Sequence, residues 1–194
     1  MGAAADQVWA MVSGLPSGKR ERCNLMVLQA VADDSGNEPP NQFFVFGGFV
    51  ADSATWAQFS DEWDKVLKEH PRIEYFKMAE ANGLRDQFEG WTPAARDEKV
   101  EKLSHIAARY PLAVIDVSIK HADFSELISS IDLPARGLST DKPYLILANQ
   151  LMVTLGDFQR KMNASEAIDL VFDTQLGFDQ ELHRWWPLFE HLRG

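Results

Sequence analysis

An apolar run that begins at Leu25 ends in the tetrapeptide Asp33-Asp34-Ser35-Gly36. A nearly continuous apolar run of this length is typical of a strand in the centre of a sheet. Its two acids and its Ser-Gly turn deliver carboxylates to the edge of that sheet, where a cation or a substrate can reach them. A second apolar run, from Ala167 to Phe172, ends in the same way at Asp173. These two strand ends constrain the fold more than any other feature of the chain.

The rest of the chain alternates between patterns typical of strands and of helices. Gly47-Gly48 inside one strand pattern indicates a bulge or the close approach of another backbone. We expect strands at 25–33, 42–51, 73–78, 112–120 and 167–173, and an irregular polar stretch at 80–92. In the strand at 112–120, apolar residues at 115, 117 and 119 alternate with polar residues at 116, 118 and 120, which predicts a half-exposed strand. We expect one helix after each of the N-caps Ser53 and Thr92, two more at 123–128 and 142–161, and a terminal helix that contains Leu182 to Leu192. This order predicts an α/β fold, with 1–24 as an N-terminal lead segment and 25–194 as a single domain.

Composition restricts the classes of function. The chain has 194 residues, of which 45% are hydrophobic, so it can bury a core. Its net charge of −10 excludes a protein that coats nucleic acid generally, although a local nucleic-acid site stays open. Cys23 is the only cysteine, which excludes an intramolecular disulfide and a thiolate zinc cluster. No segment approaches the roughly 20 apolar residues that span a bilayer, and no signal-peptide pattern is present, so we expect a cytoplasmic protein without a membrane partner.

Asp33 and Asp173 are the leading candidates for metal ligands. Mg²⁺ takes oxygen ligands, usually one or two carboxylates together with substrate phosphates. Strand alternation places Asp33 on the face of Val31, and Asp173 on the face of Asp169. If the two strands are neighbours, the two carboxylates converge and can hold an ion that assists phosphodiester cleavage. The alternative is that these acids only close turns, for which Asp34-Ser35-Gly36 is a good sequence.

Other polar residues could complete such a site. Lys77, on the predicted strand 73–78, could hold a phosphate; the alternative is an exposed charge pair with Glu74. His121 follows a strand and is the only plausible general base among the five histidines, unless it is an ordinary surface residue. One member of Trp185-Trp186 could form a contact surface, because adjacent helical positions cannot face the same core.

Short motifs give the chain a resemblance to the family called "domain of unknown function 3800". The residues that carry it are, in chain order, Asp33-Asp34-Ser35-Gly36, Phe46-Gly47-Gly48-Phe49-Val50, Trp56, Glu74-Tyr75-Phe76-Lys77 and Val171-Phe172-Asp173. In the family's first motif, Glu stands where this chain has Asp34. The resemblance implies a ribonuclease-H-like fold, which is a mixed sheet flanked by helices. It also implies nuclease-type metal chemistry, with Asp33 and Asp173 as metal ligands and Lys77 as a site residue.

Members of that family usually continue into a further helix that carries another acid, whereas this sequence reaches Gly194 without one. We therefore expect either a C-terminally truncated domain or an incomplete site. The predicted function is a divalent-metal-dependent nuclease or phosphodiesterase that uses Mg²⁺ or Mn²⁺. Asp33 and Asp173 would bind the metal, Asp34 would be an auxiliary ligand, and Lys77 would contact phosphate. The alternative is a non-catalytic interaction module of a mobile element or defence system, with a protein partner or a second copy of the chain.

Overall fold

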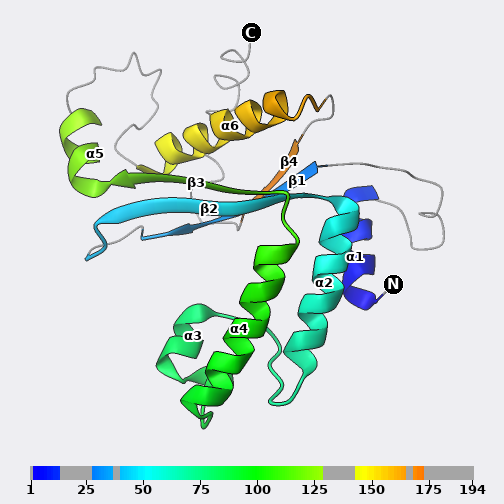
Figure 1. Cartoon of the computed structure of the whole chain (residues 1–194). Helices are drawn as coiled ribbons and strands as arrows, with labels where there is room; N and C mark the ends of the chain where they lie inside the picture. The colour runs from blue at the N-terminus through cyan, green and yellow to red at the C-terminus, as the bar shows by residue number, and fades with distance from the viewer. Residues whose placement is uncertain (1, 14–27, 37–39, 129–142, 165–167, 173–194) are drawn as a thin grey trace. The chain divides into compact units, whose positions relative to one another are not determined.

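A computed structural model describes residues 2–13, 28–36, 40–128, 143–164 and 168–172. These residues form helices and a four-stranded mixed sheet, so the predicted α/β class is confirmed (Figure 1). The chain divides into two compact units: unit 1 comprises 1–28 and 51–112, and unit 2 comprises 29–50 and 113–194. Compactness of this kind does not by itself mark separate domains. The predicted lead segment and single domain therefore stay predictions.

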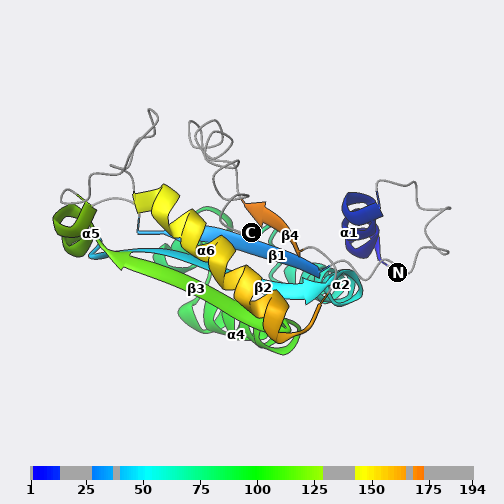
Figure 2. The ribbon, with the colours of Figure 1, turned by 90° about the horizontal axis from the view of Figure 1, so that it is seen from above.

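The sheet forms unit 2, in which the strands lie in the order β3-β2-β1-β4. The strands are β1 (Leu28–Ser35), β2 (Phe43–Asp52), β3 (Ala113–Lys120) and β4 (Ile168–Phe172). β2 pairs antiparallel with β3, from Phe43 opposite Lys120 to Val50 opposite Ala113. The connection between β1 and β2 is too short for a parallel crossover, so these two strands are also antiparallel. Because the sheet is mixed, β4 runs parallel to β1 (Figure 2).

One face of the sheet is buried under α6 (Pro143–Lys161), which crosses it diagonally (Figure 2). The buried stripe of this helix includes Tyr144, Ala148, Leu151 and Leu155, at spacings of three or four residues. Alternate residues of the strands face that stripe, and Ile115 and Val117 confirm the alternation predicted for β3. The resulting core contains Ala30, Ala32, Phe44, Phe46, Val50, Ile115, Val117, Tyr144, Leu145, Leu147, Ala148, Leu151 and Leu155. Among the described residues, no helix is long and apolar enough to cross a membrane, and this includes α6 with its 19 residues.

The other face of the sheet carries exposed and polar side chains. On β1, Val31 and Asp33 are exposed, whereas their neighbour Ala32 is buried. On β3, Asp116 and Ser118 are exposed in the same alternating way. Because side chains alternate between the two faces of a strand, all four exposed residues share the face opposite α6.

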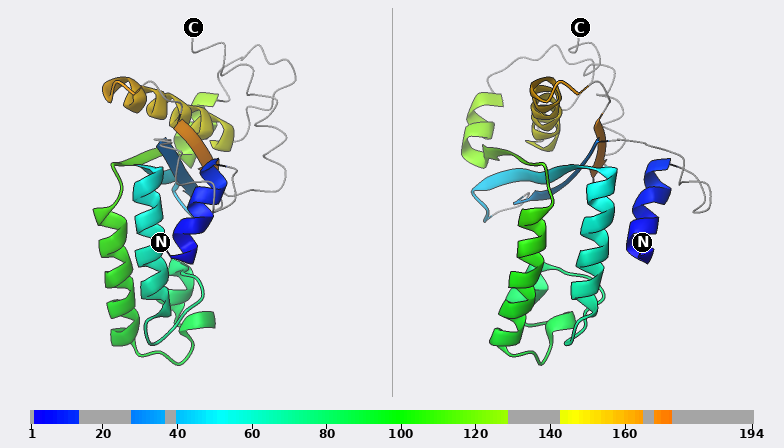
Figure 3. Two further views of the ribbon diagram at one scale, coloured as in Figure 1. Left: turned by 90° about the vertical axis from the view of Figure 1, so that its right-hand side faces the viewer. Right: turned by 45° about the vertical axis from the view of Figure 1, so that its right-hand side comes forward.

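Unit 1 is helical. It contains α1 (Ala3–Ser13), α2 (Ser53–Lys68) and α4 (Pro93–Arg109), and Figure 3 shows α2 and α4 side by side. Thr92 caps α4 as predicted, because its side chain accepts a hydrogen bond from the amide of Ala95 at 3.2 Å. The cap predicted for α2 was wrong by one residue. Asp52, not Ser53, accepts the bond from the amide of Thr55 at 2.8 Å.

The segment between α2 and α4 corrects two expectations. The strand predicted at 73–78 does not form, and the stretch expected to be irregular contains α3 (Met78–Gly83) and a 3₁₀ turn, η2 (Asp86–Phe88). The side chain of Gln87 explains the first difference. It accepts a hydrogen bond from the amide of Glu74 and donates one to the carbonyl of Tyr75 at 3.1 Å. A side chain thus occupies backbone groups that a neighbouring strand would otherwise pair.

A carboxylate on α2 holds the first turn of α1. Asp61 accepts hydrogen bonds from the amide of Gly2 at 2.7 Å and from the amide of Ala5 at 3.0 Å. These amides begin a helix and have no partner within it. The bond from Gly2 lowers the pKa of Asp61 most, the bond from Ala5 lowers it further, and partial desolvation opposes both. Asp61 therefore caps α1 from outside the helix.

We predict that Asp61→Ala loosens α1 without unfolding unit 1. Loss of a capping carboxylate costs about 1 kcal/mol, so amide hydrogen exchange over residues 3–5 should become about fivefold faster. Because the native pKa of Asp61 is lowered, the capping contribution is present above its ordinary value of 3.8 and is lost as pH falls through the lower native value. Glu62→Gln, which removes a charge that faces Arg109, is the matched control. Unchanged exchange in Asp61→Ala would contradict this account.

Candidate functional site

The candidate site begins at the carboxyl end of β1, where the sequence places Asp33 and Asp34. Asp33 is exposed, and one of its oxygens, Oδ1, accepts a hydrogen bond from the amide of Asp34 at 2.9 Å. Asp34 is half-buried. The carboxylate of Asp33 therefore meets solvent at a strand end, as the sequence predicted, and also contributes to the local backbone geometry.

The turn after β1 requires glycine. Gly36 has a φ of +81°, and a Cβ at this position would lie 2.1 Å from the carbonyl oxygen of Phe43. Only a residue without a side chain fits there. His121, the first residue of α5 (His121–Ile128), contacts the same turn from the end of β3, on the far side of β2. Its Nε2 lies 2.9 Å from the carbonyl oxygen of Gly36, and its amide donates to the carbonyl of Gln42 at 3.0 Å.

The contacts of His121 define what its ring can do. A carbonyl oxygen only accepts, so Nε2 carries the proton in the bond to Gly36. The ring also stacks on Phe44, with centroids 6.5 Å apart and planes at 25°. His121 thus lies at the same end of the sheet as Asp33, where it fixes the turn that follows the two acids. Its role as a general base stays a prediction, and Nδ1 is the nitrogen that such a role would use.

Strand register places another acid near Asp33. A Cβ on Gly48 would lie 2.5 Å from the carbonyl oxygen of Val31 and 3.0 Å from Cβ of Ala32, which is the close backbone approach predicted here. With Gly48 beside Ala32, Gly47 lies beside Asp33 on the opposite face. On its other side, Gly47 is paired with Asp116 of β3.

Asp33 and Asp116 therefore flank Gly47 on the exposed face of the sheet. Two strand spacings separate their backbones by roughly 10 Å. A Cβ on Gly47 would meet nothing within 4 Å, so the surface between the two acids is open. The sequence indicated that Asp116 is exposed, but only the strand pairing shows that it lies in the same cross-strand row as Asp33.

The metal site predicted from the sequence is only partly within the described chain. Asp173 lies outside the described residues, directly after the last residue of β4. In the described part of the chain, no group of three or more His, Cys, Asp or Glu side chains is arranged to hold a metal ion. Mg²⁺ needs only one or two protein carboxylates when substrate phosphate and water complete its coordination. The exposed carboxylate of Asp33 fits that limited role by its donor chemistry, but not that of a dedicated protein cage.

Lys77 belongs to unit 1, whereas Asp33 belongs to unit 2, so their joint participation in one site stays a prediction. Lys77 does not lie on a strand, because the segment before α3 is not paired in the sheet. Its side chain is 66% exposed, and its Nζ lies 4.0 Å from Oε1 of Glu80 and 5.4 Å from the ring centroid of Tyr75. The acid near Lys77 is therefore Glu80 on α3, and not Glu74 as the sequence suggested.

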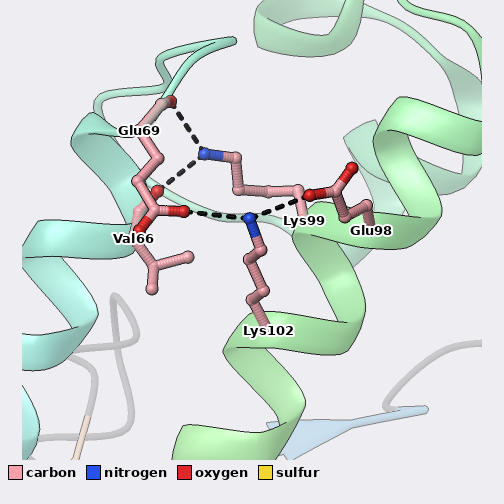
Figure 4. A network of polar contacts seen from close by, with 5 residues as sticks. All are labelled: Val66, Glu69, Glu98, Lys99 and Lys102. Carbon is pink, nitrogen blue, oxygen red and sulfur yellow. Dashed lines mark hydrogen bonds and ion pairs between the residues drawn. The ribbon is translucent and has the colours of Figure 1, made fainter.

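A buried lysine that the sequence did not single out lies between α2 and α4 (Figure 4). Nζ of Lys99 donates to the carbonyl oxygens of Val66 at 2.6 Å and Glu69 at 2.9 Å. Burial lowers the pKa of Lys99, and the charge of Glu69 opposes that effect. Perturbed lysines often mark sites of chemistry. Here the two carbonyls belong to the last turn of α2 and the residue after it, so the ammonium caps the helix at its negative end.

Lys102 extends this network at the surface. Its Nζ lies 3.1 Å from Glu69 and 2.9 Å from Glu98, as Figure 4 shows. Hydrogen bonding to Glu98 raises the pKa of Lys102, and the same bond lowers the pKa of Glu98. The network joins α4 to the end of α2 and satisfies its own polar groups. It is an element of structure in unit 1 and supplies no free group for catalysis.

No protein-family model, no curated protein and no solved structure matches the chain. The resemblance to the family of unknown function therefore stays a prediction. The case for a site depends on the residues at the end of β1 and their neighbours in the sheet.

We predict that His121→Ala destabilises unit 2 by about 1 kcal/mol, since it removes one hydrogen bond to the turn after β1 and a ring contact. Chemical denaturation followed by circular dichroism measures the change in the free energy of unfolding. His105→Ala, at an exposed position of α4, is the control and should change stability little. An equal effect of the two substitutions would show that the bond to Gly36 contributes nothing specific.

We also predict that Lys99→Met destabilises unit 1 by about 1 to 3 kcal/mol. Methionine retains much of the aliphatic length but leaves the carbonyls of Val66 and Glu69 without the donor that now satisfies them. The melting temperature measures this loss. Lys102→Met, which removes a charge from the exposed part of the same network, is the control and should have a smaller effect. A wild-type melting temperature in Lys99→Met would refute the capping role.

Proposed function

We propose that the chain is a divalent-metal-dependent nuclease or phosphodiesterase whose ion, Mg²⁺ or Mn²⁺, binds at the carboxyl end of β1. The observation that carries this proposal is the position of Asp33, an exposed carboxylate at a strand end. The turn that follows has Gly36 in a left-handed conformation, and His121 contacts its carbonyl oxygen. The open surface at Gly47 leaves room beside it for a phosphodiester.

Under this proposal, Asp33 and Asp173 bind the ion, and Asp34 is an auxiliary ligand or orients Asp33. The direction of β4 supports the participation of Asp173, because Asp173 follows a strand that runs parallel to β1. When bound, the ion supplies Lewis acidity toward a phosphoryl oxygen and a more acidic water. Lys77 contacts a substrate phosphate, for which its exposed ammonium is suited.

The fold that best accommodates this function is the ribonuclease-H-like one. Its general description is a mixed sheet flanked by helices. Three features of unit 2 support it: the sheet is mixed, β1 lies inside it between β2 and β4, and α6 covers one face. Fold alone does not establish a reaction, so the proposal depends on the acids rather than on the architecture.

A second candidate function is a non-catalytic interaction module of a mobile element or defence system. The observation that favours it is the exposed apolar surface of the sheet. Val31 is 40% exposed and Val114 is 69% exposed on this face, and Phe43, which is 50% exposed, lies at the other end of β2. Exposed apolar side chains on one face are common where another protein binds. Trp186, the contact residue suggested by the sequence, lies outside the described residues.

We predict that Asp33→Asn abolishes Mn²⁺-dependent cleavage and leaves the fold intact. The asparagine can still accept the bond from the amide of Asp34, but it lacks the charge that holds a cation. The expected loss exceeds about 100-fold, because removal of even an outer partner of a metal ligand costs about 10- to 100-fold. Cleavage of single- and double-stranded DNA and RNA with Mg²⁺ or Mn²⁺ is the assay. Asp123→Asn, at an exposed position of α5, is the matched control.

Titration calorimetry with Mn²⁺ separates binding from chemistry in the same variants. The wild type should give a saturable heat that Asp33→Asn loses. If the wild type cleaves none of these substrates and gives no saturable heat, the metal-dependent proposal fails. If the wild type binds Mn²⁺ saturably but cleaves none of the substrates, the proposed ion site is retained and the proposed nuclease activity is rejected.

A further inference from the structure

One edge of the sheet is available for pairing. β3 is the outermost strand on its side, and β2 pairs with it along its whole length, from Ala113 to Lys120. In the part of the chain that the structure describes, no backbone group of β3 pairs with anything on its other side. A strand in this position presents a row of N–H and C=O groups to a partner strand.

The charges on β3 select a particular partner. Asp116 and Lys120 both lie on the exposed face, four residues apart along the strand, with Ser118 midway between them. Neither Asp116 nor Lys120 has an ion-pair partner among the residues that are described. Two opposite charges placed symmetrically about one residue are self-complementary under a two-fold axis.

We propose that a second copy of this chain binds at the carboxyl-terminal part of β3, where residues 116–120 of the two copies pair antiparallel about a two-fold axis at Ser118. In this register Asp116 of each copy lies opposite Lys120 of the other, so that two ion pairs form across the interface. The two sheets would join into one continuous sheet. This inference does not depend on the proposed nuclease function.

Charge excludes one alternative register and disfavours another. Residues opposite each other in an antiparallel pair lie on the same face, so the pairing can shift only in steps that preserve the alternation. An axis at Asp116 would place the two Asp116 side chains against each other, which is destabilising. An axis at Val117 would place Lys120 opposite Val114 and leave both charges without a direct partner. The axis at Ser118 is the one that pairs both charges.

The interface of a single strand pair is small, and this sets the expected affinity. Stable dimers bury about 1,600 Å² in total, and weaker encounters bury less than about 1,200 Å². We therefore expect a weak dimer, with a dissociation constant on the order of 10 to 100 µM. The exposed charges on β3 also protect the edge against unspecific pairing, as charged edge strands generally do.

Sedimentation velocity at protein concentrations from roughly 5 to 500 µM tests the proposal by charge exchange. The wild type should shift from monomer to dimer over this range. Asp116→Lys should weaken association at least about tenfold, because it places two like charges opposite each other twice, and Lys120→Asp should do the same. The double variant Asp116→Lys/Lys120→Asp should dimerise as the wild type does, since the pairs are restored in reverse.

The most specific test mixes the two single variants, Asp116→Lys and Lys120→Asp. Each alone should be monomeric, whereas an equimolar mixture should form a heterodimer, because one copy then presents two lysines opposite two aspartates. Glu101→Lys on α4, which changes the net charge as Asp116→Lys does, is the control and should dimerise normally. Melting curves by circular dichroism confirm that each variant is folded. A monomeric wild type, a dimer that ignores the charge exchanges, or an inert mixture would each overturn the proposal.

Discussion

The burial of one sheet face under α6 is the interaction on which unit 2 depends. The helix contributes a stripe of large side chains, of which Leu145 and Leu151 are almost fully buried, and the strands contribute Phe44 and Phe46. Burying a side chain of this size contributes about 1.5 to 3 kcal/mol, so this contact outweighs any single polar interaction in the unit. It also fixes which residues face outward. Once Ala32 is committed to the core, its neighbour Asp33 must face the exposed side of β1.

Sequence patterns predicted the elements whose periodicity is set by that core. The alternation on β3 gave the correct face for Val117 and Asp116, and the bounds of α6 were within one residue. The predicted strand at 73–78 was wrong because the hydrogen bonds of Gln87 decide the local backbone, and such a bond between distant residues leaves no periodic signal. The neighbourhood of Gly47 could not be predicted either, because register depends on which strands pair.

In the candidate site, too, features set by a single strand were predictable from the sequence, whereas features set by contacts between distant residues were not. The exposed strand-end position of Asp33 follows from its own strand and was predictable. The bond from His121 to Gly36 joins residues from two strand ends, and Lys99 acts on carbonyls of another helix. Both depend on tertiary placement. Burial lowers the pKa of Lys99, which caps a helix, so a perturbed group need not mark a site of chemistry.

The proposed site and the proposed dimer would influence each other through Asp116. In a monomer, the carboxylates of Asp33 and Asp116 flank Gly47, and their combined field attracts a cation but repels a phosphodiester. Dimerisation would pair Asp116 with a lysine of the second copy and would leave Asp33 as the dominant negative charge near Gly47. A cation held there by Asp33 would then meet less repulsion when it binds a polyanionic substrate. The separation of roughly two strand spacings is comparable to the Debye length of about 8 Å at physiological salt, so this coupling would be modest and would weaken as ionic strength rises.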